Sequence, residues 1–370
     1  MELDRKHGSS GSHERVVVAL SGGVDSSVAA ALLVAEGHDV VGVTLRLQRC
    51  QEAGASRSCC GVDGIARARA VAGQIGIPHY VLDCVDSFDA TVLRPTWDEY
   101  AAGRTPSPCL LCNERIKFGT LLAWARGIGA SSVATGHYAR VGRDGAGLPF
   151  LLRGSDPAKD QSYFLAGLTR EQLGSVRFPL GDKCKDEVRE LARSMDLPSA
   201  DAPDSQDACL VAPGESFAEM LRKRFAAPVV PGPVIAEDGT CLGQHQGIHL
   251  FTVGQRRGLP GPSHLKHWVT AVHAEEATVR VSSDEHSLDG RAFRAIGMNW
   301  LDPVRCAPGG HCLVQVRYRH PPVAAWVERT KPDVATVTLD EPVRAIAPGQ
   351  AAVFYDGSRV LGRGWIHLHT

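Results

Sequence analysis

The sequence predicts a Rossmann-like α/β domain with a doubly wound parallel sheet, followed by a small central domain and a C-terminal β-barrel. Over the first half, short apolar runs alternate with helical segments, which is typical of parallel βαβ units whose helices cover the sheet. Beyond about Pro213, proline and glycine become frequent and only one short helical stretch remains. From about Ser282, alternating runs recur between turn residues, which favours a small barrel or sandwich.

The length of the chain agrees with several domains. A chain of 370 residues with 44% hydrophobic content exceeds one typical domain and can bury a substantial core. We therefore predict a disordered tail (1–14), a catalytic domain (15–212), a central domain (213–281) and a barrel domain (282–370).

The catalytic domain is expected to begin with a strand in "VVVAL" after Arg15, an alanine-rich helix to about Glu36 and a strand in "DVVGVTLRL". A helix in "DGIARARAVAGQIG", a strand in "HYVLDC" and a helix in "WDEYAAG" follow. Next come a helix from Asn113 to about Arg126 and a strand in "SSVATGHYA". The later domains show one helix in "ESFAEMLRKRF" and alternating runs such as "CLVQVRYRH", "VAAWVER" and "VATVTL".

Charge and hydropathy restrict the functional classes. Forty Lys and Arg against 41 Asp and Glu give a net charge of −1, so any attraction for nucleic acid must be local. No run of about 18 apolar residues and no apolar signal core occur, which predicts a cytoplasmic protein without a membrane partner.

Cysteine usage points to reduced thiols. The chain has 11 cysteines, an odd number, and no secretion signal, which argues against a disulfide framework. We expect the isolated cysteines to be small buried packing residues; they are Cys50, Cys84, Cys184, Cys241, Cys306 and Cys312.

A glycine-serine turn between the first strand and the first helix predicts an anion site. In "VVVALSGGVDSSVAAALL", Ser21, Gly22 and Gly23 precede a helical turn that contains Asp25, Ser26 and Ser27. Backbone N–H groups, hydroxyls and the positive end of the helix would bind phosphate there. The loop is neither a Walker A loop nor a G-x-G-x-x-G motif. The simpler alternative is a strand-to-helix turn capped by Asp or Ser.

A pair of cysteines three positions apart follows in "RTPSPCLLCNERIKF". Cys109 and Cys112 are compatible with half a zinc site, a redox pair, iron–sulfur ligands or a sulfur-carrying nucleophile with a neighbour. Zinc is disfavoured because no second C-x-x-C completes four ligands, and a thioredoxin-type pair because the strand-to-helix setting is lacking. The helix expected to begin at Asn113 would favour the Cys112 thiolate with its positive end.

The glycine-serine turn resembles the pyrophosphate loop of the N-type ATP pyrophosphatases. Together with "GRTPSPCLLCNERIKF", "ATGHYAR", "RGSDPAKDQSYFL", "APDSQDACLV", "FTVGQRRGL", "VRYR" and "APGQAAVFYDG", the order of blocks resembles the bacterial tRNA-specific 2-thiouridylase family, from about Val16 to Ile366. The resemblance implies a fold like that of the adenine nucleotide alpha hydrolases. It also implies ATP-dependent replacement of the carbon-2 oxygen of the tRNA wobble uridine by sulfur, with Mg²⁺.

The family chemistry requires two thiols. Adenylation first makes carbon 2 electrophilic. One cysteine then carries the sulfur as a persulfide, and a second cysteine releases that sulfur by attacking the persulfide. By resemblance, Cys209 carries the persulfide and Cys112 is the partner nucleophile. The implied partners are tRNA with Lys-, Glu- or Gln-type anticodon loops, and a cysteine desulfurase or sulfur-relay protein.

Other site residues carry over by resemblance, position by position. The nucleotide would contact Ala19, Leu20, Ser21, Gly22, Gly23, Val24, Asp25, Ser26, Ser27, Leu45 and Gly136. The tRNA would contact Ser107, Pro108, Cys109, His137, Lys159, Asp160, Gln161, Arg317, Tyr318 and Gln350. Arg and Tyr suit phosphate binding and base stacking in a single-stranded loop.

The chain departs from the family at two places. Leu45 stands where relatives usually have methionine, and Ser107-Pro108-Cys109 stands where many have Asn-Pro-Asp, so Cys109 cannot serve as a carboxylate base. The second departure supports an alternative in which Cys109, Cys112 and Cys209 hold three irons of a [4Fe–4S] cluster that delivers sulfide. Two further alternatives are an ATP-dependent amide or amidine ligase sharing only the pyrophosphate loop, and a noncatalytic RNA-binding relative.

Overall fold

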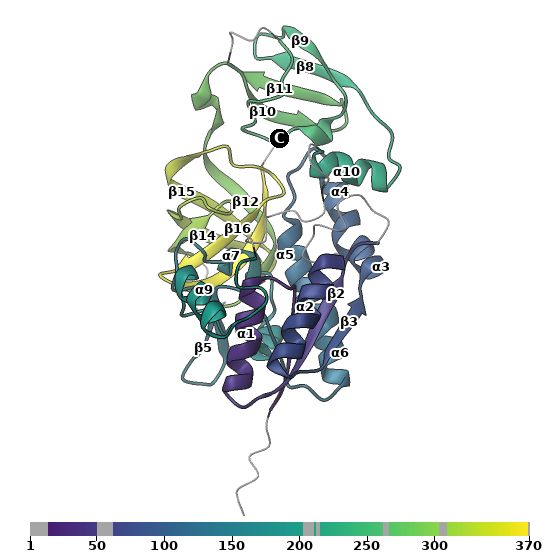
Figure 1. Ribbon diagram of the computed structural model, residues 1–370. Helices are drawn as coiled ribbons and strands as arrows, with labels where there is room; N and C mark the ends of the chain where they lie inside the picture. Colours follow the sequence, from purple (N-terminus) through teal and green to yellow (C-terminus); the bar gives the residue numbers. More distant parts are fainter. Residues whose placement is uncertain are drawn as a thin grey trace, which may run out of the picture.

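The computed structural model describes residues 14–49, 62–202, 211, 215–261, 266–302 and 309–368. The expected disordered tail lies almost wholly outside these residues. Figure 1 shows a helix-covered sheet at one end, a barrel beside it and a small sheet domain at the other end. The sequence-predicted class, a doubly wound parallel sheet followed by a central domain and a β-barrel, is confirmed.

The first sheet has five parallel strands in the order β3-β2-β1-β4-β7. The strands are β1 (Arg15–Ala19), β2 (Asp39–Arg46), β3 (His79–Asp83), β4 (Ser132–Ala134) and β7 (Val176–Arg177). After β1, the chain adds β2 and β3 on one side of β1. It later adds β4 and β7 on the other side of β1. The carboxyl end of β1 is therefore a topological switch point, where α/β sheets bind ligands.

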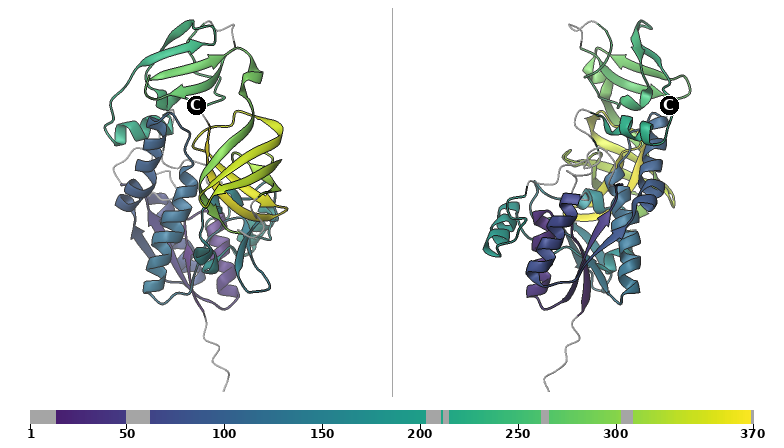
Figure 2. Two further views of the ribbon diagram at one scale, coloured as in Figure 1. Left: turned by 180° about the vertical axis from the view of Figure 1, so that it is seen from behind. Right: turned by 45° about the vertical axis from the view of Figure 1, so that its right-hand side comes forward.

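Helices cover both faces of this sheet, because β1 is apolar at every core position (Figure 2). On one face, Val16 and Val18 pack against Ala30 and Leu33 of α1 (Val24–Ala35) and against α2 (Val62–Ile75). On the other face, Val17 joins a core with α3 (Val85–Phe88), η1 (Asp89–Leu93), α4 (Arg94–Ala101), α5 (Pro108–Cys112), η2 (Asn113–Thr120) and α6 (Leu121–Gly127). Opposite side-chain directions in alternate strand residues produce this division.

The helix bearing Cys112 begins earlier than predicted. It starts at Pro108, with Ser107 as N-cap, because proline suits the first helical turn and its missing N–H costs nothing there. The chain then continues without a break through η2, a π-helix, into α6. The side chain of Gln172 donates to the backbone oxygens of Glu114 and Phe118, at 3.0 and 2.8 Å, and so supports the wider π-helical turns.

One further predicted element differs from the structure. The strand expected over "SSVATGHYA" is interrupted after β4, and Ala139 begins a hairpin of β5 (Ala139–Arg143) and β6 (Pro149–Arg153). The helices α7 (Ser162–Leu165) and α8 (Arg170–Gly174) follow, and α9 (Lys185–Ser194) packs on α1 through Val188 and Ala192.

The central domain has a four-stranded sheet in the order β10-β11-β8-β9. Its strands are β8 (Gly232–Ala236), β9 (Cys241–His245), β10 (Trp268–His273) and β11 (Thr278–Ser282), and its helices are α10 (Phe217–Arg224) and the 3₁₀-helix η3 (Ile248–Leu250). An ion pair of 2.9 Å between Arg224 and Asp89 ties α10 to the catalytic helices.

The C-terminal barrel contains β12 (Asp289–Trp300), β13 (Gly309–Gln315), β14 (Val323–Lys331), β15 (Val334–Arg344), β16 (Ala351–Asp356) and β17 (Arg359–His367), after the 3₁₀-helix η4 (Glu285–Leu288). Within the eight-stranded order β12-β15-β14-β13-β16-β17-β6-β5, pairing of β12 with β17 closes the first six strands. The hairpin β5–β6 extends the same sheet through β17. Tyr355 and Val353 share one core with the helices around Cys112. The predicted domain boundaries stay a prediction.

The buried ion pair between Glu114 and Arg363 joins the π-helix to the barrel at 2.8 Å, and the Arg363 side chain is 8% exposed. Burial lowers the pKa of the Arg363 guanidinium, and Glu114 opposes that effect. We expect Glu114→Gln to lower the free energy of unfolding by about 3 kcal/mol, because it leaves a buried charge without its partner. Urea unfolding at neutral pH measures this loss.

The double variant Glu114→Gln/Arg363→Met is the control. It removes both charges and is expected to recover much of the loss. A single variant that unfolds at the wild-type midpoint would show that the pair contributes nothing.

Candidate active site

The predicted pyrophosphate loop connects the end of β1 to the start of α1, at the switch point of the sheet. Gly22 has a φ of +77°, and a Cβ there would lie 2.4 Å from the backbone oxygen of Gly64, so both the conformation and the space require glycine. Gly23 is the N-cap of α1. The loop thus directs the free N–H groups of the first turn of α1 toward the carboxyl edge of the sheet.

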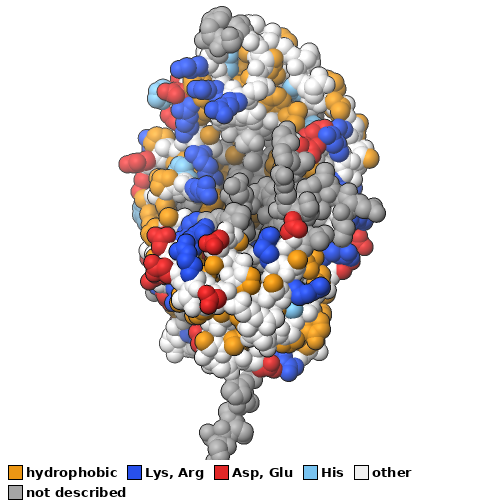
Figure 3. All heavy atoms as spheres, viewed as in Figure 1, with side chains coloured by type: hydrophobic (Ala, Val, Ile, Leu, Met, Phe, Trp, Pro, Cys, Tyr) orange, Lys and Arg blue, Asp and Glu red, His pale blue; other side chains and the backbone are white. Residues whose placement is uncertain are grey.

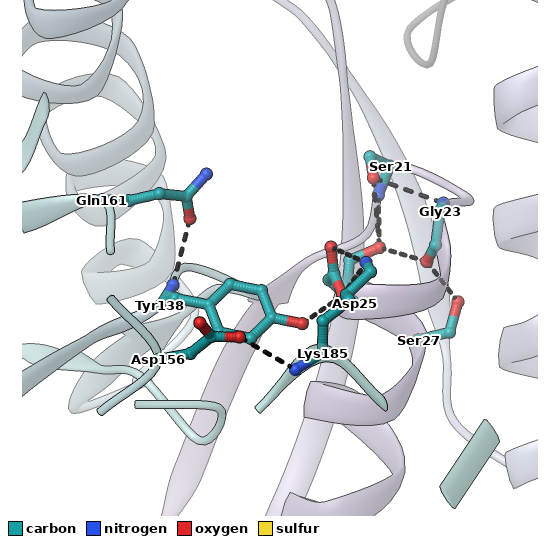
Figure 4. A network of polar contacts seen from close by, with 9 residues as sticks. Ser21, Gly23, Asp25, Ser27, Tyr138, Asp156, Gln161 and Lys185 are labelled. Carbon is teal, nitrogen blue, oxygen red and sulfur yellow. Dashed lines mark hydrogen bonds and ion pairs between the residues drawn. The ribbon is translucent and has the colours of Figure 1, made fainter. Parts of the chain in front are cut away.

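The serine hydroxyls hold the loop in shape (Figure 4). Ser26 Oγ and Ser27 Oγ both donate to the backbone oxygen of Gly23, at 3.0 and 2.9 Å. Ser26 Oγ in turn accepts a bond of 3.2 Å from the backbone N–H of Ser21. Sequence reasoning assigned these serines to phosphate binding, and the structure shows that they also organise the turn itself.

Asp25 is bound by two residues that sequence reasoning missed. Lys185 Nζ lies 2.7 and 2.9 Å from the two carboxylate oxygens of Asp25, and the Tyr138 hydroxyl donates to the first of them at 2.7 Å (Figure 4). Lys185 is only 9% exposed. A lysine in the first turn of a helix opposes the helix dipole, so its position at the start of α9 was a signal that a tertiary partner exists.

Gly136 brings the segment after β4 against the pyrophosphate loop. A Cβ at this position would lie 2.7 Å from both the carbonyl carbon of Asp25 and the backbone nitrogen of Ser26. Only a residue without a side chain permits this approach, which accounts for the interruption of the predicted strand. The family-derived contact of Gly136 with nucleotide stays a prediction, but its place beside the loop is now established.

We expect Gly136→Ala to weaken binding of an ATP analogue by about tenfold or more, because the added methyl must displace the first turn of α1. Calorimetric titration measures the change. Gly73→Ala on α2 is the matched control, because a Cβ there meets nothing within 4 Å, and we expect wild-type affinity. Equal affinity of both variants would contradict the steric argument.

His137 lies beside Gly136 and faces the helix that bears Cys112. Its ring is 6.1 Å from the rings of both Phe118 and Phe178, and its Nδ1 is 2.6 Å from Thr135 Oγ1. Burial, and to a smaller extent the charge of Lys117, hold the pKa of His137 well below its usual range. His137 is therefore neutral at physiological pH, and any contact with tRNA would be a hydrogen bond rather than an ion pair.

Cys112 is half-buried on the last turn of α5, and Cys109 is exposed one turn earlier. Burial raises the pKa of the Cys112 thiol to about 11, and Lys117 opposes this effect. The expectation that a helix N-terminus favours the thiolate is wrong, because the helix begins at Pro108 and Cys112 is its fifth residue. The thiol is protonated at neutral pH in this form of the protein.

A third cysteine lies near Cys112. Cys84, which follows β3, is buried, and burial together with the charge of Asp83 and Cys112 raises its pKa to about 11. The expectation that isolated cysteines are buried is confirmed for Cys84 and wrong for Cys184 and Cys241, which are exposed. Cys184 is the N-cap of α9, so its side chain lies at the start of the helix and not in the core. Cys50 and Cys306 lie outside the described residues.

Cys209, the predicted persulfide carrier, also lies outside the described residues. Within the ranges the structure describes, no group of three or more His, Cys, Asp or Glu side chains could hold a metal ion. Because the alternative [4Fe–4S] cluster requires Cys209, both it and the pairing of Cys112 with Cys209 stay predictions.

The structure brings several predicted tRNA contacts close to the Cys112 helix. Gln350, from the barrel, donates through Nε2 to the backbone oxygens of Thr105 and Pro106, at 3.2 and 3.0 Å, and so fixes the chain just before Ser107 and Pro108. Ser107 is buried and bonds the Tyr163 hydroxyl. The exposed Cys109 is the member of this triplet most open to a ligand.

Tyr318 and Arg317 lie on the barrel side of the same region. The Tyr318 ring is 4.3 Å from that of Phe164, whose backbone oxygen accepts a bond from Asn113, the residue after Cys112. Arg317 Nη1 donates to the backbone oxygens of Arg344 and Ala345, at 3.1 and 3.3 Å.

The triplet Lys159-Asp160-Gln161 follows the β5–β6 hairpin. Asp160 accepts bonds from Arg153, Gly154 and Ser162, and Gln161 Oε1 accepts the backbone N–H of Tyr138 at 3.0 Å. Lys159 is half-buried and Leu45 is buried at the end of β2. Asp160 and Gln161 thus order the chain around Tyr138, and the ligand contacts of all four residues stay predictions.

Taken together, a parallel sheet whose switch point holds a glycine-serine turn, a helix N-terminus and a lysine-paired aspartate defines an α/β protein of the ATP pyrophosphatase class. None of the described helices is long and apolar enough to cross a membrane.

Comparison with known proteins specifies the family. Residues 14–213 match the tRNA methyl transferase HUP domain, residues 219–283 the tRNA methyl transferase PRC-barrel domain, and residues 290–366 the aminomethyltransferase beta-barrel domain. The chain is 44% identical to the tRNA-specific 2-thiouridylase MnmA of Geobacter metallireducens over 95% of this chain and 96% of that one. It is 46% identical to the protein of the same name from Rhodospirillum centenum, over 95% and 91%. The chain belongs to the tRNA-specific 2-thiouridylase family.

Solved structures show only distant likeness. An NMN synthetase from Francisella tularensis shares 19% identity at a TM-score of 0.33, covering 60% of this chain and 80% of that one. A 4-thiouridine synthetase in complex with RNA and ATP shares 15% identity at a TM-score of 0.34, covering 58% and 50%. The chain's membership of the family is shown by the matching family models and the sequence relatives.

Proposed function

We propose that the protein uses ATP to replace the carbon-2 oxygen of the wobble uridine of tRNA with sulfur, as a tRNA-uridine 2-sulfurtransferase. The observation that carries this proposal is a continuous path from the phosphate loop to a thiol. Gly136 lies against Asp25 and Ser26, the tilted rings of His137 and Phe118 have centroids 6.1 Å apart, and Phe118 lies on the helical run that follows Cys112. This arrangement supports a single site for an activated nucleotide on the loop and a sulfur nucleophile on the helix.

In the first step, the carbon-2 oxygen of uridine attacks the α-phosphorus of ATP, nitrogen 3 gives up its proton to solvent, and the bond to the β-phosphate oxygen breaks to release pyrophosphate. The N–H groups at the start of α1 bind the departing pyrophosphate. Mg²⁺ would neutralise phosphate charge. Asp25 is the carboxylate of the loop, and both its oxygens bond Lys185, so phosphate oxygens and water would supply most ligands of the ion.

In the second step, sulfur displaces AMP. The Cys112 thiolate attacks the inner sulfur of a Cys209 persulfide, which forms a Cys112–Cys209 disulfide and releases hydrosulfide. Hydrosulfide adds to carbon 2, its proton passes to nitrogen 3, and the carbon–oxygen bond breaks as AMP leaves. A thiol reductant then restores both cysteines. A cysteine desulfurase or sulfur-relay protein reloads Cys209.

The tRNA is expected to approach the face on which the barrel, the central sheet and the Cys112 helix meet. On the face seen in Figure 3, Lys and Arg side chains lie along the left-hand side, over the central sheet and the barrel, with several Asp and Glu side chains among them. These cations support local contacts with a polyanion although the net charge of the chain is −1. Tyr318 beside Phe164 offers an aromatic surface for an unstacked base.

A reconstituted reaction tests the proposal. The purified protein is incubated with ATP, Mg²⁺, a desulfurase with cysteine, and unmodified tRNA of the Lys, Glu or Gln type; 2-thiouridine, AMP and pyrophosphate are quantified. We expect equal amounts of the three products, and none with a transcript that carries cytidine at the wobble position. AMP release that needs an amine acceptor and yields no thiouridine would instead support the ligase alternative.

Iron analysis in the same assay distinguishes the two sulfur sources. Anaerobically purified protein that is active without iron supports the persulfide. A brown, iron-rich protein whose activity is lost with its iron would instead support the [4Fe–4S] cluster on Cys109, Cys112 and Cys209 as the sulfur source.

A further inference from the structure

One short segment of the chain holds both residues that bind Asp25. The segment, residues 155–161, follows the β5–β6 hairpin and contains the triplet that is predicted to contact tRNA. Through Gln161 it binds Tyr138, and through Asp156 it binds Lys185 (Figure 4). The 155–161 segment therefore has two separate connections to the carboxylate of the phosphate loop.

The first connection runs through Tyr138, whose backbone Gln161 binds at two points. Gln161 Oε1 accepts the Tyr138 N–H at 3.0 Å, and the Gln161 N–H donates to the Tyr138 backbone oxygen at 2.9 Å. Tyr138 is 3% exposed, and its hydroxyl donates to Asp25 Oδ1 at 2.7 Å. Because a close-packed ring cannot move freely, a shift of the Tyr138 backbone also moves the hydroxyl that binds Asp25.

The second connection runs through Asp156 and the start of α9. Asp156 Oδ2 accepts the backbone N–H of Lys185 at 3.2 Å, and Oδ1 accepts the N–H of Ala158 at 2.9 Å. The first N–H groups of a helix have no partner within the helix, so Asp156 supplies one of the acceptors that α9 needs. The Lys185 ammonium in turn binds both oxygens of Asp25.

Asp160 holds the two ends of the 155–161 segment together. Its Oδ1 accepts the backbone N–H groups of Gly154 and Ser162, both at 3.0 Å, and the Asp160 side chain is only 8% exposed. The outermost residues of the segment are exposed; they are Ser155, Pro157 and Ala158. A ligand can thus reach the outer part of a segment whose inner part is bonded to both partners of Asp25.

We propose that the 155–161 segment couples tRNA binding to nucleotide binding, with Tyr138 and Lys185 as the positioning residues that act on Asp25. The inference deepens the proposed function and rests on it for the identity of the RNA. RNA bound at the segment favours the arrangement that keeps both oxygens of Asp25 on Lys185 and Tyr138, so that phosphate meets no free carboxylate. Each ligand then strengthens binding of the other by the same factor.

Two binding titrations on the full-length protein measure this factor. The affinity for α,β-methylene-ATP, which cannot be cleaved between its α- and β-phosphates, is determined by calorimetry with and without saturating unmodified tRNA of the Lys type. We expect the wild-type protein to bind the analogue about tenfold more tightly with tRNA. Tyr138→Phe and Asp156→Ala each remove one connection, and each should lower the factor to about threefold. The double variant should lower it to about one.

Matched variants remove the same groups elsewhere. Tyr80→Phe removes the hydroxyl of an exposed tyrosine on β3. Asp144→Ala removes a carboxylate that accepts the N–H groups of Ala146 and Leu148 in the turn between β5 and β6. Both are expected to keep the wild-type factor. Thermal unfolding of each variant shows whether it is folded, and the two single variants decide the question if the double variant does not fold.

The binding factor and the thiolation assay report on different claims. A wild-type factor near one, or folded Tyr138→Phe and Asp156→Ala proteins that keep the wild-type factor, would overturn the inference, whatever the thiolation activity. A wild-type protein that couples the two ligands but makes no thiouridine would overturn the proposed function and leave the coupling in place.

Discussion

Replacing Lys185 with methionine is expected to slow tRNA-stimulated ATP–pyrophosphate exchange by about 100-fold or more. Lys185 neutralises Asp25 at the mouth of the phosphate loop. Without it, an uncompensated carboxylate would face the departing pyrophosphate, and the positive charge that favours its release would be lost. The exchange of labelled pyrophosphate into ATP measures the effect.

The double variant Asp25→Asn/Lys185→Met separates catalysis from stability. The single Lys185→Met change leaves Asp25 without its cation and should lower the free energy of unfolding by about 2 kcal/mol. This loss is smaller than for a fully buried pair, because the Asp25 side chain is 33% exposed and water screens its charge. Removing both charges should recover most of that stability. It should not recover the exchange rate, because the cation remains absent.

Lys183→Met provides the matched control. It removes a lysine two residues away from Lys185, before the start of α9, and is expected to exchange pyrophosphate at the wild-type rate. If the double variant exchanged pyrophosphate at the wild-type rate, the pair would be structural only.

Replacing Cys112 with alanine is expected to reduce tRNA thiolation by about 1,000-fold while the uridine is still adenylated and pyrophosphate is still released. The nucleotide site is complete without this side chain, because the loop is formed by Ser21 to Ser27 with Gly136 and Lys185. Only the release of sulfur requires the thiol. Mass spectrometry of tRNA nucleosides measures thiolation, and the release of pyrophosphate measures adenylation.

Two further cysteine variants sharpen this experiment. Cys241→Ala, at an exposed site in the central domain, should thiolate as wild type does. Cys109→Ala distinguishes the sulfur sources: persulfide chemistry tolerates the change, whereas a cluster loses a ligand. Thiolation by Cys112→Ala at the wild-type rate would exclude Cys112 from sulfur transfer.

The sequence predicts local chemistry well where short-range rules govern it. The glycine at position 22 is required by a positive φ and by the backbone of Gly64, and the glycine-serine motif shows this without coordinates. The barrel is likewise predicted by alternating runs. Helix starts are less well predicted: the helix was expected to begin at Asn113, but it begins at Pro108, because proline is favoured in the first turn of a helix.

Residues whose role depends on distant partners were not predictable in the same way. Lys185 and Asp25 are 160 positions apart, and no periodicity relates them. The environment of Cys112 also differs from the local expectation, because burial raises its pKa where a helix end was expected to lower it.

The sequence by itself determined the order of domains, the nucleotide loop and the two cysteines on which the predicted chemistry depends, because hydrophobic period, turn residues and motifs act over a few neighbouring positions. Only the tertiary structure decided that a lysine from α9 pairs with the loop and that Gly136 brings His137 beside it. Charge interactions, desolvation and close backbone contact depend on distances through space, and these are set by packing between segments far apart in the chain.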